Sequence, residues 1–244
     1  MSKSLLFFIH ISKNAGSSIE QYFESEGIML GRLDPFYSNH NINWHTPPNS
    51  FPQNLKDSFQ HNIQGKTIFF VHRSPFDRVL SEMNCKWGNP KKEVIQDSKS
   101  RFNFYLSQYL IGVLLRRLHN WPYALLVRMN LLIPLGRDHW IPQSHYIEHT
   151  TYDTTQFKVI PYESLRQGVS ELLGRQVTLP RINEQSAAFK HSSCSINAIN
   201  KALIALAYAD DMINHKRLLE KGKVCVNLSQ VNWTLFSLNS KWSR

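Results

Sequence analysis

The chain is poor in cysteine. It holds three cysteines in 244 residues, Cys85, Cys194 and Cys225, and no two of them form a C-x-x-C pair. A disulfide framework needs an even set of cysteines, and a structural zinc site needs closely spaced ligand pairs. The sequence carries neither signature, and it predicts three free thiols in a reducing compartment.

Long apolar runs are also missing. Residues 106–136 are rich in leucine, but Arg116, Arg117 and Arg128 interrupt them before a span of about 20 apolar residues is reached. We expect buried or amphipathic helices there, with core packing as the main role of the apolar side chains and a lipid role as the minor alternative. Only residues 1–4 precede the first predicted strand, so no signal peptide is expected and the predicted location is the cytoplasm.

Acidic side chains are outnumbered by basic ones. The chain has 28 lysines and arginines against 18 aspartates and glutamates, a net charge of +10. This balance predicts attraction to a polyanion, which includes nucleic acid, an anionic nucleotide, an acidic glycan and a membrane surface. No zinc finger, basic tract or recognition-motif aromatic pair is present, so a nucleic-acid partner is not expected. A basic nucleic-acid-binding or scaffold protein stays open as an alternative.

The most informative stretch lies near the amino terminus. Leu5 to Ile9 is a short apolar run typical of a strand buried on both faces. A loop of small residues, Ser12 to Ser18, follows, and apolar side chains then recur at helical spacing as far as Gly27, where we expect the helix to end. A strand, a small-residue loop and a helix N-terminus together form an anion site, to which Lys13 adds a positive charge.

A second strand, Thr67 to Val71, runs into a similar arrangement. Arg73 follows this strand, and Pro75 predicts the start of a helix that carries Arg78 and, about one turn later, Ser81. In open α/β sheets, ligands bind at the carboxyl ends of strands. An arginine fork with a hydroxyl group matches a phosphate monoester.

The remaining pattern is that of an α/β protein of one domain. Further strands are predicted at Ile28–Leu30 and Phe157–Ile160, and a long polar loop at Asp34–Pro52. Helices are predicted over Gln53–Gln60, over Phe102–Leu118, from Tyr162–Leu165 onward, and over Ala198–Leu219. Residues 220–244 are expected to form a C-terminal extension, either a strand pair or a packing arm.

The order of residues in the first loop is unlike that of the nucleotide loop of kinases and GTPases, whose lysine comes last. With Lys13 first and Gly16 three residues later, the loop resembles the 5′-phosphosulfate loop of sulfotransferases that use 3′-phosphoadenosine 5′-phosphosulfate (PAPS). The closest likeness is to a carbohydrate branch with a His-Ile-Pro-Lys-Thr-Ala-Gly-like sequence. Ser12 and Asn14 depart from that pattern. The resemblance covers about residues 5–219 and implies a single sulfotransferase domain over 1–244, with a central parallel sheet flanked by helices and a helical insert.

The resemblance also implies roles for individual residues. Lys13 would stabilise the leaving group, and Arg73 and Ser81 would hold the 3′-phosphate. The 5′-phosphate would be held by the loop residues Lys13, Asn14, Ala15, Gly16, Ser17 and Ser18. Two histidines are candidates for the base: His45 in the long polar loop, and then His139, which opens a His-Trp-x-Pro-Gln-like segment ending at Gln143.

The implied reaction is transfer of a sulfuryl group from PAPS to a hydroxyl group of an acceptor, a carbohydrate, without a metal. A P-loop nucleotide or sugar kinase is the second enzymatic reading. A degenerate sulfotransferase that binds the donor without turnover is another, because of Ser12 and Asn14. Acceptor identity and oligomeric state do not follow from the sequence.

Overall fold

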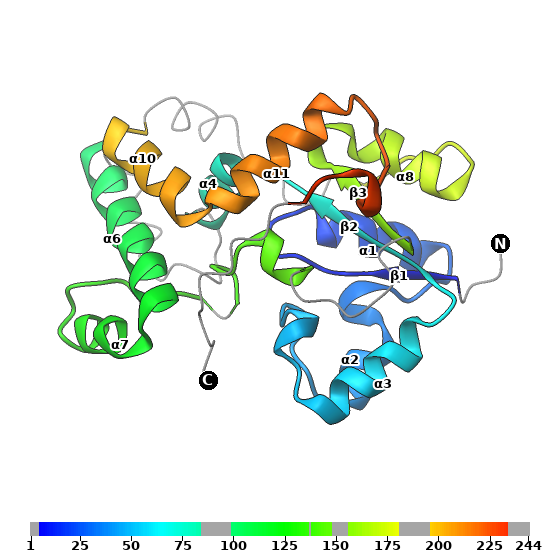
Figure 1. The fold of residues 1–244 in the computed structure, drawn as a ribbon, viewed down its shortest axis with the longest axis horizontal. Coiled ribbons are helices and arrows are strands. Elements are labelled where there is room, and N and C mark those ends of the chain that lie inside the picture. Colours follow the sequence, from blue (N-terminus) through cyan, green and yellow to red (C-terminus); the bar gives the residue numbers. More distant parts are fainter. Residues whose placement is uncertain (1–4, 84–98, 137, 148–155, 181–195, 234–244) are drawn as a thin grey trace. The chain divides into compact units, whose positions relative to one another are not determined.

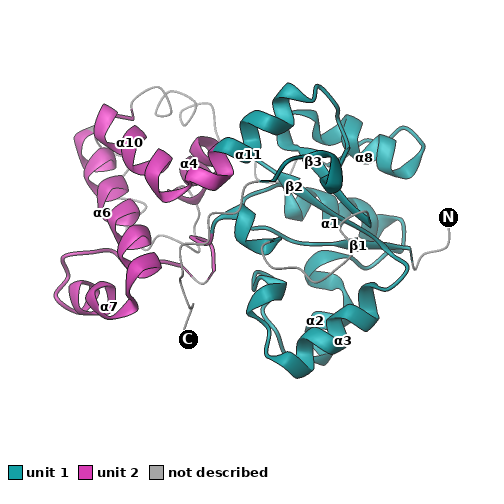
Figure 2. Ribbon diagram, in the orientation of Figure 1, with its two compact units in different colours: residues 1–74, 142–182, 213–235 teal, residues 75–141, 183–212, 236–244 magenta. Residues whose placement is uncertain are grey.

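The computed structural model describes residues 5–83, 99–136, 138–147, 156–180 and 196–233. Contacts divide the chain into two compact units, coloured separately in Figure 2. Unit 1 contains residues 1–74, 142–182 and 213–235, and unit 2 contains residues 75–141, 183–212 and 236–244. A single domain over 1–244 stays a prediction.

Unit 1 is built on a four-stranded sheet with the order β1-β2-β3-β4 (Figure 1). Strands β1 (Leu6–Phe8), β2 (Thr67–His72) and β3 (Phe157–Pro161) are parallel, and β4 (Val226–Asn227) pairs antiparallel with β3. The first three strands were predicted as continuous apolar runs because both faces of a parallel sheet are buried. The predicted α/β class is therefore confirmed, and the sheet, predicted to be parallel, is mostly parallel because β4 runs antiparallel to β3.

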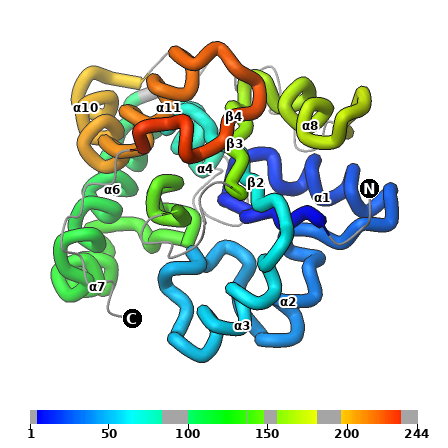
Figure 3. The backbone as a smooth tube through the Cα atoms, turned by 45° about the vertical axis from the view of Figure 1, so that its right-hand side comes forward, coloured from blue at the N-terminus to red at the C-terminus, as the bar shows by residue number. Residues whose placement is uncertain are grey.

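Helices cover both faces of this sheet. Helices α1 (Gly16–Ser25) and α8 (Leu165–Leu173) pack on one face, where Phe8 and Phe69 contact each other. Helices α2 (Pro35–Asn39) and α3 (Gln53–Ile63) cover the other face. That face is packed by the aromatic rings of Phe7, Tyr37 and Phe59. In Figure 3, α8 and the α2–α3 pair lie on opposite sides of the strands.

Two predictions between α1 and α3 are wrong. Ile28–Leu30 is not a strand, because Gly27 (φ 68°) ends α1 and the Ile28 N–H bonds back to the Phe23 carbonyl at 2.8 Å. The stretch 34–52 is not one long loop. It contains α2, capped by the Asp34 carboxylate through the Phe36 N–H, and the 3₁₀ helix η2 (Pro48–Ser50).

The regular secondary structure in the described part of unit 2 is helical. It contains α4 (Pro75–Met83), α6 (Lys99–Leu118), α7 (Asn120–Arg128) and α10 (Ala198–Ala207). Pro75 starts α4 as predicted, since its fixed φ suits the first helical turn. No helix in the described part of the chain is both long enough and apolar enough to cross a membrane.

The helix predicted over 198–219 is two helices, α10 and α11 (Ala209–Glu220). Tyr208 leaves the helical conformation (φ −129°, ψ 37°), and the Arg117 guanidinium donates to the last carbonyl of α10, on Ala207. Asp210 and Asp211, expected in mid-helix, therefore lie in the first turn of α11, where the helix dipole favours negative charge. Of the predicted extension, residues 226–230 form β4 and η6 (Leu228–Gln230), and 234–244 lie outside the described residues.

Candidate anion-binding site

The loop between β1 and α1 has a backbone suited to binding an anion. Lys13 (φ 65°) and Ala15 (φ 63°, ψ 16°) adopt the left-handed conformation, which is costly for residues other than glycine. Ala15 is the N-cap residue of α1 and has no side-chain oxygen with which to cap it. The change from left-handed Ala15 to helical Gly16 turns successive N–H groups toward one point, the arrangement known as a nest.

The N–H groups at the start of α1 are available to a ligand. Ser18 and Ile19 donate to the Ala15 carbonyl, each at 3.1 Å. Within the part of the chain that the structure describes, the N–H groups of Ala15, Gly16 and Ser17 have no acceptor. Unpaired donors at the start of a helix, together with the helix dipole, attract an anion. The loop therefore offers a ready phosphate- or sulfate-sized site.

Arg73 lies beside this loop, as the sequence predicted for the end of β2. Its Nη1 donates to the Lys13 carbonyl at 2.9 Å, and its Cζ lies 4.2 Å from the centre of the Tyr162 ring. No carboxylate among the described residues pairs with Lys13 or Arg73. The loop thus carries the Lys13 charge and is bonded by the Arg73 guanidinium, which favours an anionic ligand.

Asn14 and Gln143 hold the two chain segments together. The Asn14 amide donates to the Val71 carbonyl at 2.6 Å and to Gln143 Oε1 at 2.5 Å. Gln143, fully buried, accepts from the Arg73 N–H at 2.9 Å and donates to the Arg73 carbonyl at 2.8 Å. Gln143 ends the His-Trp-x-Pro-Gln-like segment that His139 opens. In the structure, Gln143 uses these bonds to join the end of β2 to the anion-binding loop.

A buried contact between a histidine and a carboxylate, which the sequence analysis missed, lies next to the loop. His10 Nδ1 lies 2.5 Å from Glu20 Oε1, and Glu20 is fully buried. The same carboxylate accepts from the Arg32 N–H at 2.8 Å and lies 3.1 Å from Arg32 Nε. The His10 ring lies directly against Gly16, where a Cβ atom would be 2.3 Å from it. No sequence pattern signals a pair of residues ten positions apart.

His45 lies next to His10, beside the anion-binding loop. Its ring centre lies 4.7 Å from that of His10, edge to face, and its carbonyl accepts from the Tyr146 hydroxyl at 2.6 Å. His45 Nε2 accepts from the indole N–H of Trp44 at 3.2 Å. A lone pair used in this way cannot take a proton, and Nδ1 of the same neutral ring carries the hydrogen, so a base role for His45 requires Trp44 to release Nε2.

Ser81 and His139, the remaining predicted site residues, belong to unit 2. Ser81 is half-buried on α4. His139 Nδ1 lies 3.0 Å from Glu82 Oε2, and the His139 carbonyl accepts from Arg78 Nη2 at 2.9 Å. The Arg78 side chain is buried. Glu82, one turn after Arg78, is a second residue that the sequence analysis did not identify, and its carboxylate orients the His139 ring.

Two buried tyrosines, Tyr109 and Tyr208, lie near the charges of Arg78 and Glu82 in unit 2. Desolvation raises the pKa of Tyr208 to about 12, although the nearby Arg78 charge acts to lower it. Burial likewise raises the pKa of Tyr109 well above its usual value. The two hydroxyl groups lie 3.5 Å apart. Both phenols therefore stay neutral at physiological pH.

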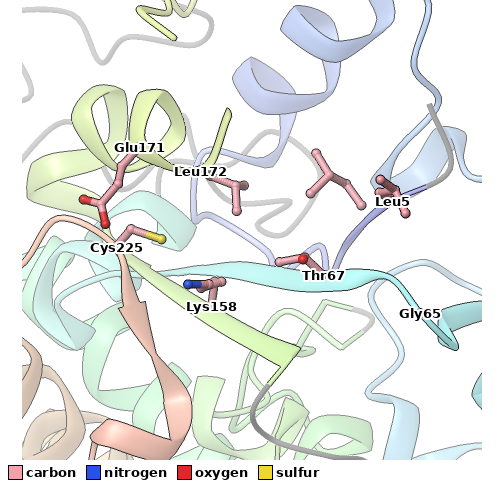
Figure 4. Close-up of a pocket in the computed structure, with 8 residues that line it drawn as sticks. Leu5, Gly65, Thr67, Lys158, Glu171, Leu172 and Cys225 are labelled. Carbon is pink, nitrogen blue, oxygen red and sulfur yellow. The ribbon is translucent and has the colours of Figure 1, made fainter. Parts of the chain in front are cut away.

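Figure 4 shows a separate cavity of about 210 Å³ in unit 1. It is lined by the starts of β1, β2 and β3, the edge opposite to the one at which the anion-binding loop lies. The lining residues are Leu5, Leu6, Gly65, Thr67, Lys158, Glu171, Leu172 and Cys225. Burial raises the pKa of the Cys225 thiol to about 11, so this thiol stays protonated and is a poor nucleophile.

Comparison with known proteins gives no relative from which a function can be transferred. No protein-family model matches the chain, and no curated protein or solved structure matches it. The function is therefore argued from the geometry of the site.

Proposed function

We propose that this protein is an O-sulfotransferase that uses PAPS as donor and a hydroxylated acceptor, a carbohydrate. The acceptor oxygen attacks sulfur, the bond from sulfur to the bridging oxygen of the 5′-phosphosulfate breaks, and adenosine 3′,5′-bisphosphate leaves. The proton of the acceptor hydroxyl passes to a base. Positioning and electrostatics carry most of the rate in such an in-line displacement.

The observation that supports this proposal is the anion-binding loop between β1 and α1. A doubly phosphorylated adenosine needs two cationic sites, and the donors of Ala15, Gly16 and Ser17 offer one on the loop that carries Lys13 and accepts a hydrogen bond from Arg73. Because Arg73 Nη1 bonds to the Lys13 carbonyl, the Arg73 guanidinium is adjacent to the backbone of Lys13. The sulfuryl-transfer hypothesis requires this adjacency.

Each residue then has a defined task. The nest binds the 5′-phosphate, and the Lys13 ammonium stabilises the negative charge that develops on the bridging oxygen. Arg73 uses Nη1 on the loop, and no described residue bonds its Nη2, which is available to the 3′-phosphate. A contribution of Ser81 to the 3′-phosphate stays a prediction.

The base is assigned to His45, which contacts His10 at the loop. On this assignment, Trp44 must release Nε2 when acceptor binds, which couples acceptor binding to the appearance of a competent base. His139, oriented by Glu82, is the alternative. The two are separated by comparing His45→Asn with His139→Asn, since loss of the base lowers kcat while binding of the bisphosphate is retained.

Binding of adenosine 3′,5′-bisphosphate tests the proposal. At about 100 times Kd the ligand adds about 2.7 kcal/mol to the free energy of unfolding. Each kcal/mol raises the Tm of a chain of this size by about 2–4 °C, so a rise of about 5–11 °C is expected. Lys13→Ala should abolish most of this rise, whereas Lys221→Ala should retain it, because Lys221 is exposed on the turn after α11.

Other ligands distinguish the competing readings. Equal stabilisation by 5′-AMP would show that no site for the 3′-phosphate exists. Magnesium-dependent consumption of ATP would favour the kinase reading. Salt-sensitive DNA binding without any effect of the bisphosphate would favour a nucleic-acid-binding protein. Bisphosphate binding without sulfate transfer to any hydroxylated acceptor would leave a donor-binding protein that does not turn over.

A further inference from the structure

Helix α7 of unit 2 exposes an apolar stripe that the proposed function does not use. Trp121 is 74% exposed, and Leu125 and Met129 follow it at intervals of four residues. Arg128, seven residues after Trp121, lies in the same stripe and is exposed. We call these four residues the α7 face. Leu118 and Leu131, both more than half exposed, flank it in the chain.

The opposite side of α7 is fixed to the rest of unit 2. Tyr123 is buried, and its hydroxyl accepts from the Leu135 N–H at 2.7 Å. The Arg116 guanidinium lies 5.5 Å from the Tyr123 ring centre. Because Tyr123 anchors the helix, the α7 face is held toward solvent and cannot turn into the core. Clustered exposed side chains of this size mark an interaction surface.

The charge around this face is of one sign. The last turn of α6 and helix α7 contain three arginines, Arg116, Arg117 and Arg128, and no aspartate or glutamate. Within the described residues, Arg128 has no partner for its guanidinium. A single tryptophan beside leucine, methionine and arginine is the composition of a helix that lies in a membrane interface: the apolar groups enter the acyl boundary, and arginine reaches the headgroups.

We propose that the α7 face binds the surface of an anionic phospholipid bilayer. A negatively charged leaflet complements Arg116, Arg117 and Arg128, whereas a second copy would bring the same cationic segment, without carboxylates, against this one. The proposal does not depend on the sulfotransferase assignment. It places the protein on the membrane surface through an interfacial helix.

Flotation of the full-length protein with vesicles tests this binding. Vesicles of phosphatidylcholine with about 30 mol % phosphatidylserine should carry the protein upward, and pure phosphatidylcholine should not. Raising the salt from about 0.1 M to about 0.5 M should weaken the attraction, because the Debye length shortens. The indole fluorescence of Trp121 should shift to the blue on binding, and Trp121→Ser should remove that shift.

Two variants and two matched controls define the face. Trp121→Ser withdraws one apolar side chain from the bilayer and should weaken binding by at least about tenfold. Each unit of charge contributes about fivefold near an anionic surface, so Arg128→Glu should weaken binding by about 25-fold. Leu219→Ser and Lys221→Glu, which alter exposed residues of unit 1, should leave binding unchanged.

Three results would overturn the proposal. One is failure to float with phosphatidylserine vesicles at low salt. Another is equal loss of binding in Arg128→Glu and Lys221→Glu, which would show only a diffuse effect of net charge. The third is a dimer, seen by sedimentation at micromolar protein and abolished by Trp121→Ser, which would identify a second copy as the occupant. Arg128→Glu makes no change to a buried contact, so its circular dichroism should match that of the wild type.

Discussion

Replacing Gly16 by alanine adds a methyl group where the His10 ring already lies. The new Cβ would stand 2.3 Å from both Cε1 and Nε2 of that ring and 2.8 Å from Cδ2. His10 cannot retreat freely, because its Nδ1 is 2.5 Å from the buried Glu20 carboxylate. Either the ring leaves Glu20, or the first turn of α1 moves and the nest N–H groups lose their common direction.

The expected cost follows from these two outcomes. Overpacking of a buried site destabilises a protein by about 1–3 kcal/mol. Each kcal/mol lowers Tm by about 2–4 °C in a chain of this size, so Gly16→Ala should lower Tm by about 2–12 °C. Gly112→Ala is the matched control: its Cβ would meet Tyr123 at 3.4 Å, an ordinary contact, within helix α6. That control should be neutral or stabilising.

A double-mutant cycle with His10→Ala tests the cause. Without the imidazole ring, the methyl group of Gly16→Ala enters free space, so the cost of the substitution should shrink by at least about 1 kcal/mol in the His10→Ala background. Bisphosphate binding, lost in Gly16→Ala, should return in part in the double variant. Additive free energies of unfolding would refute the reasoning, since they would show that the two residues do not collide.

Three further predictions concern other buried groups. Asn14→Asp puts a carboxylate against the carbonyl oxygen of Val71 and the amide oxygen of Gln143, and denaturant unfolding should show a loss of about 3 kcal/mol or more. Burial raises the pKa of Asp34 above 3.8, so the folded chain holds this proton more tightly and stability falls as pH rises from 3.8 through the raised pKa. Asp34→Asn keeps the helix cap and should therefore be more stable than wild type at neutral pH, an advantage that disappears below pH 3.8. The Cys225 thiol, with its pKa near 11, should resist iodoacetamide at neutral pH in the folded chain and react after unfolding, as read by mass spectrometry of its peptide.

The parts of the fold that the sequence predicts are those that local chemistry decides. A run of apolar β-forming residues gives β2 in any context, and Pro75 and Gly27 mark helix ends through their own backbone preferences. The anion-binding loop belongs to the same class, because its donors come from the backbone at a helix start. These features need no knowledge of distant residues.

The parts that the sequence does not predict depend on contacts between distant residues. The α10–α11 break cannot be read from residues 198–219, which are amphipathic throughout. It accompanies the bond from Arg117 to the Ala207 carbonyl, 90 positions apart, and the burial of the Tyr208 side chain. The His10–Glu20 pair is similar: a glutamate one residue after Ile19 looks like a solvent-exposed position until the fold buries it.

Asn14 shows how such contacts bear on function. It departs from the threonine of the sulfotransferase-like pattern, which on sequence alone put the loop in doubt. In the structure its amide spans from the loop to the carbonyl of Val71 and to Gln143, which in turn bonds the backbone of Arg73 through both amide atoms. A threonine has a single hydroxyl hydrogen and cannot donate to both oxygens at once. The departure therefore strengthens the connection between the two cationic segments, and Asn14→Thr should weaken bisphosphate binding even though it restores the pattern.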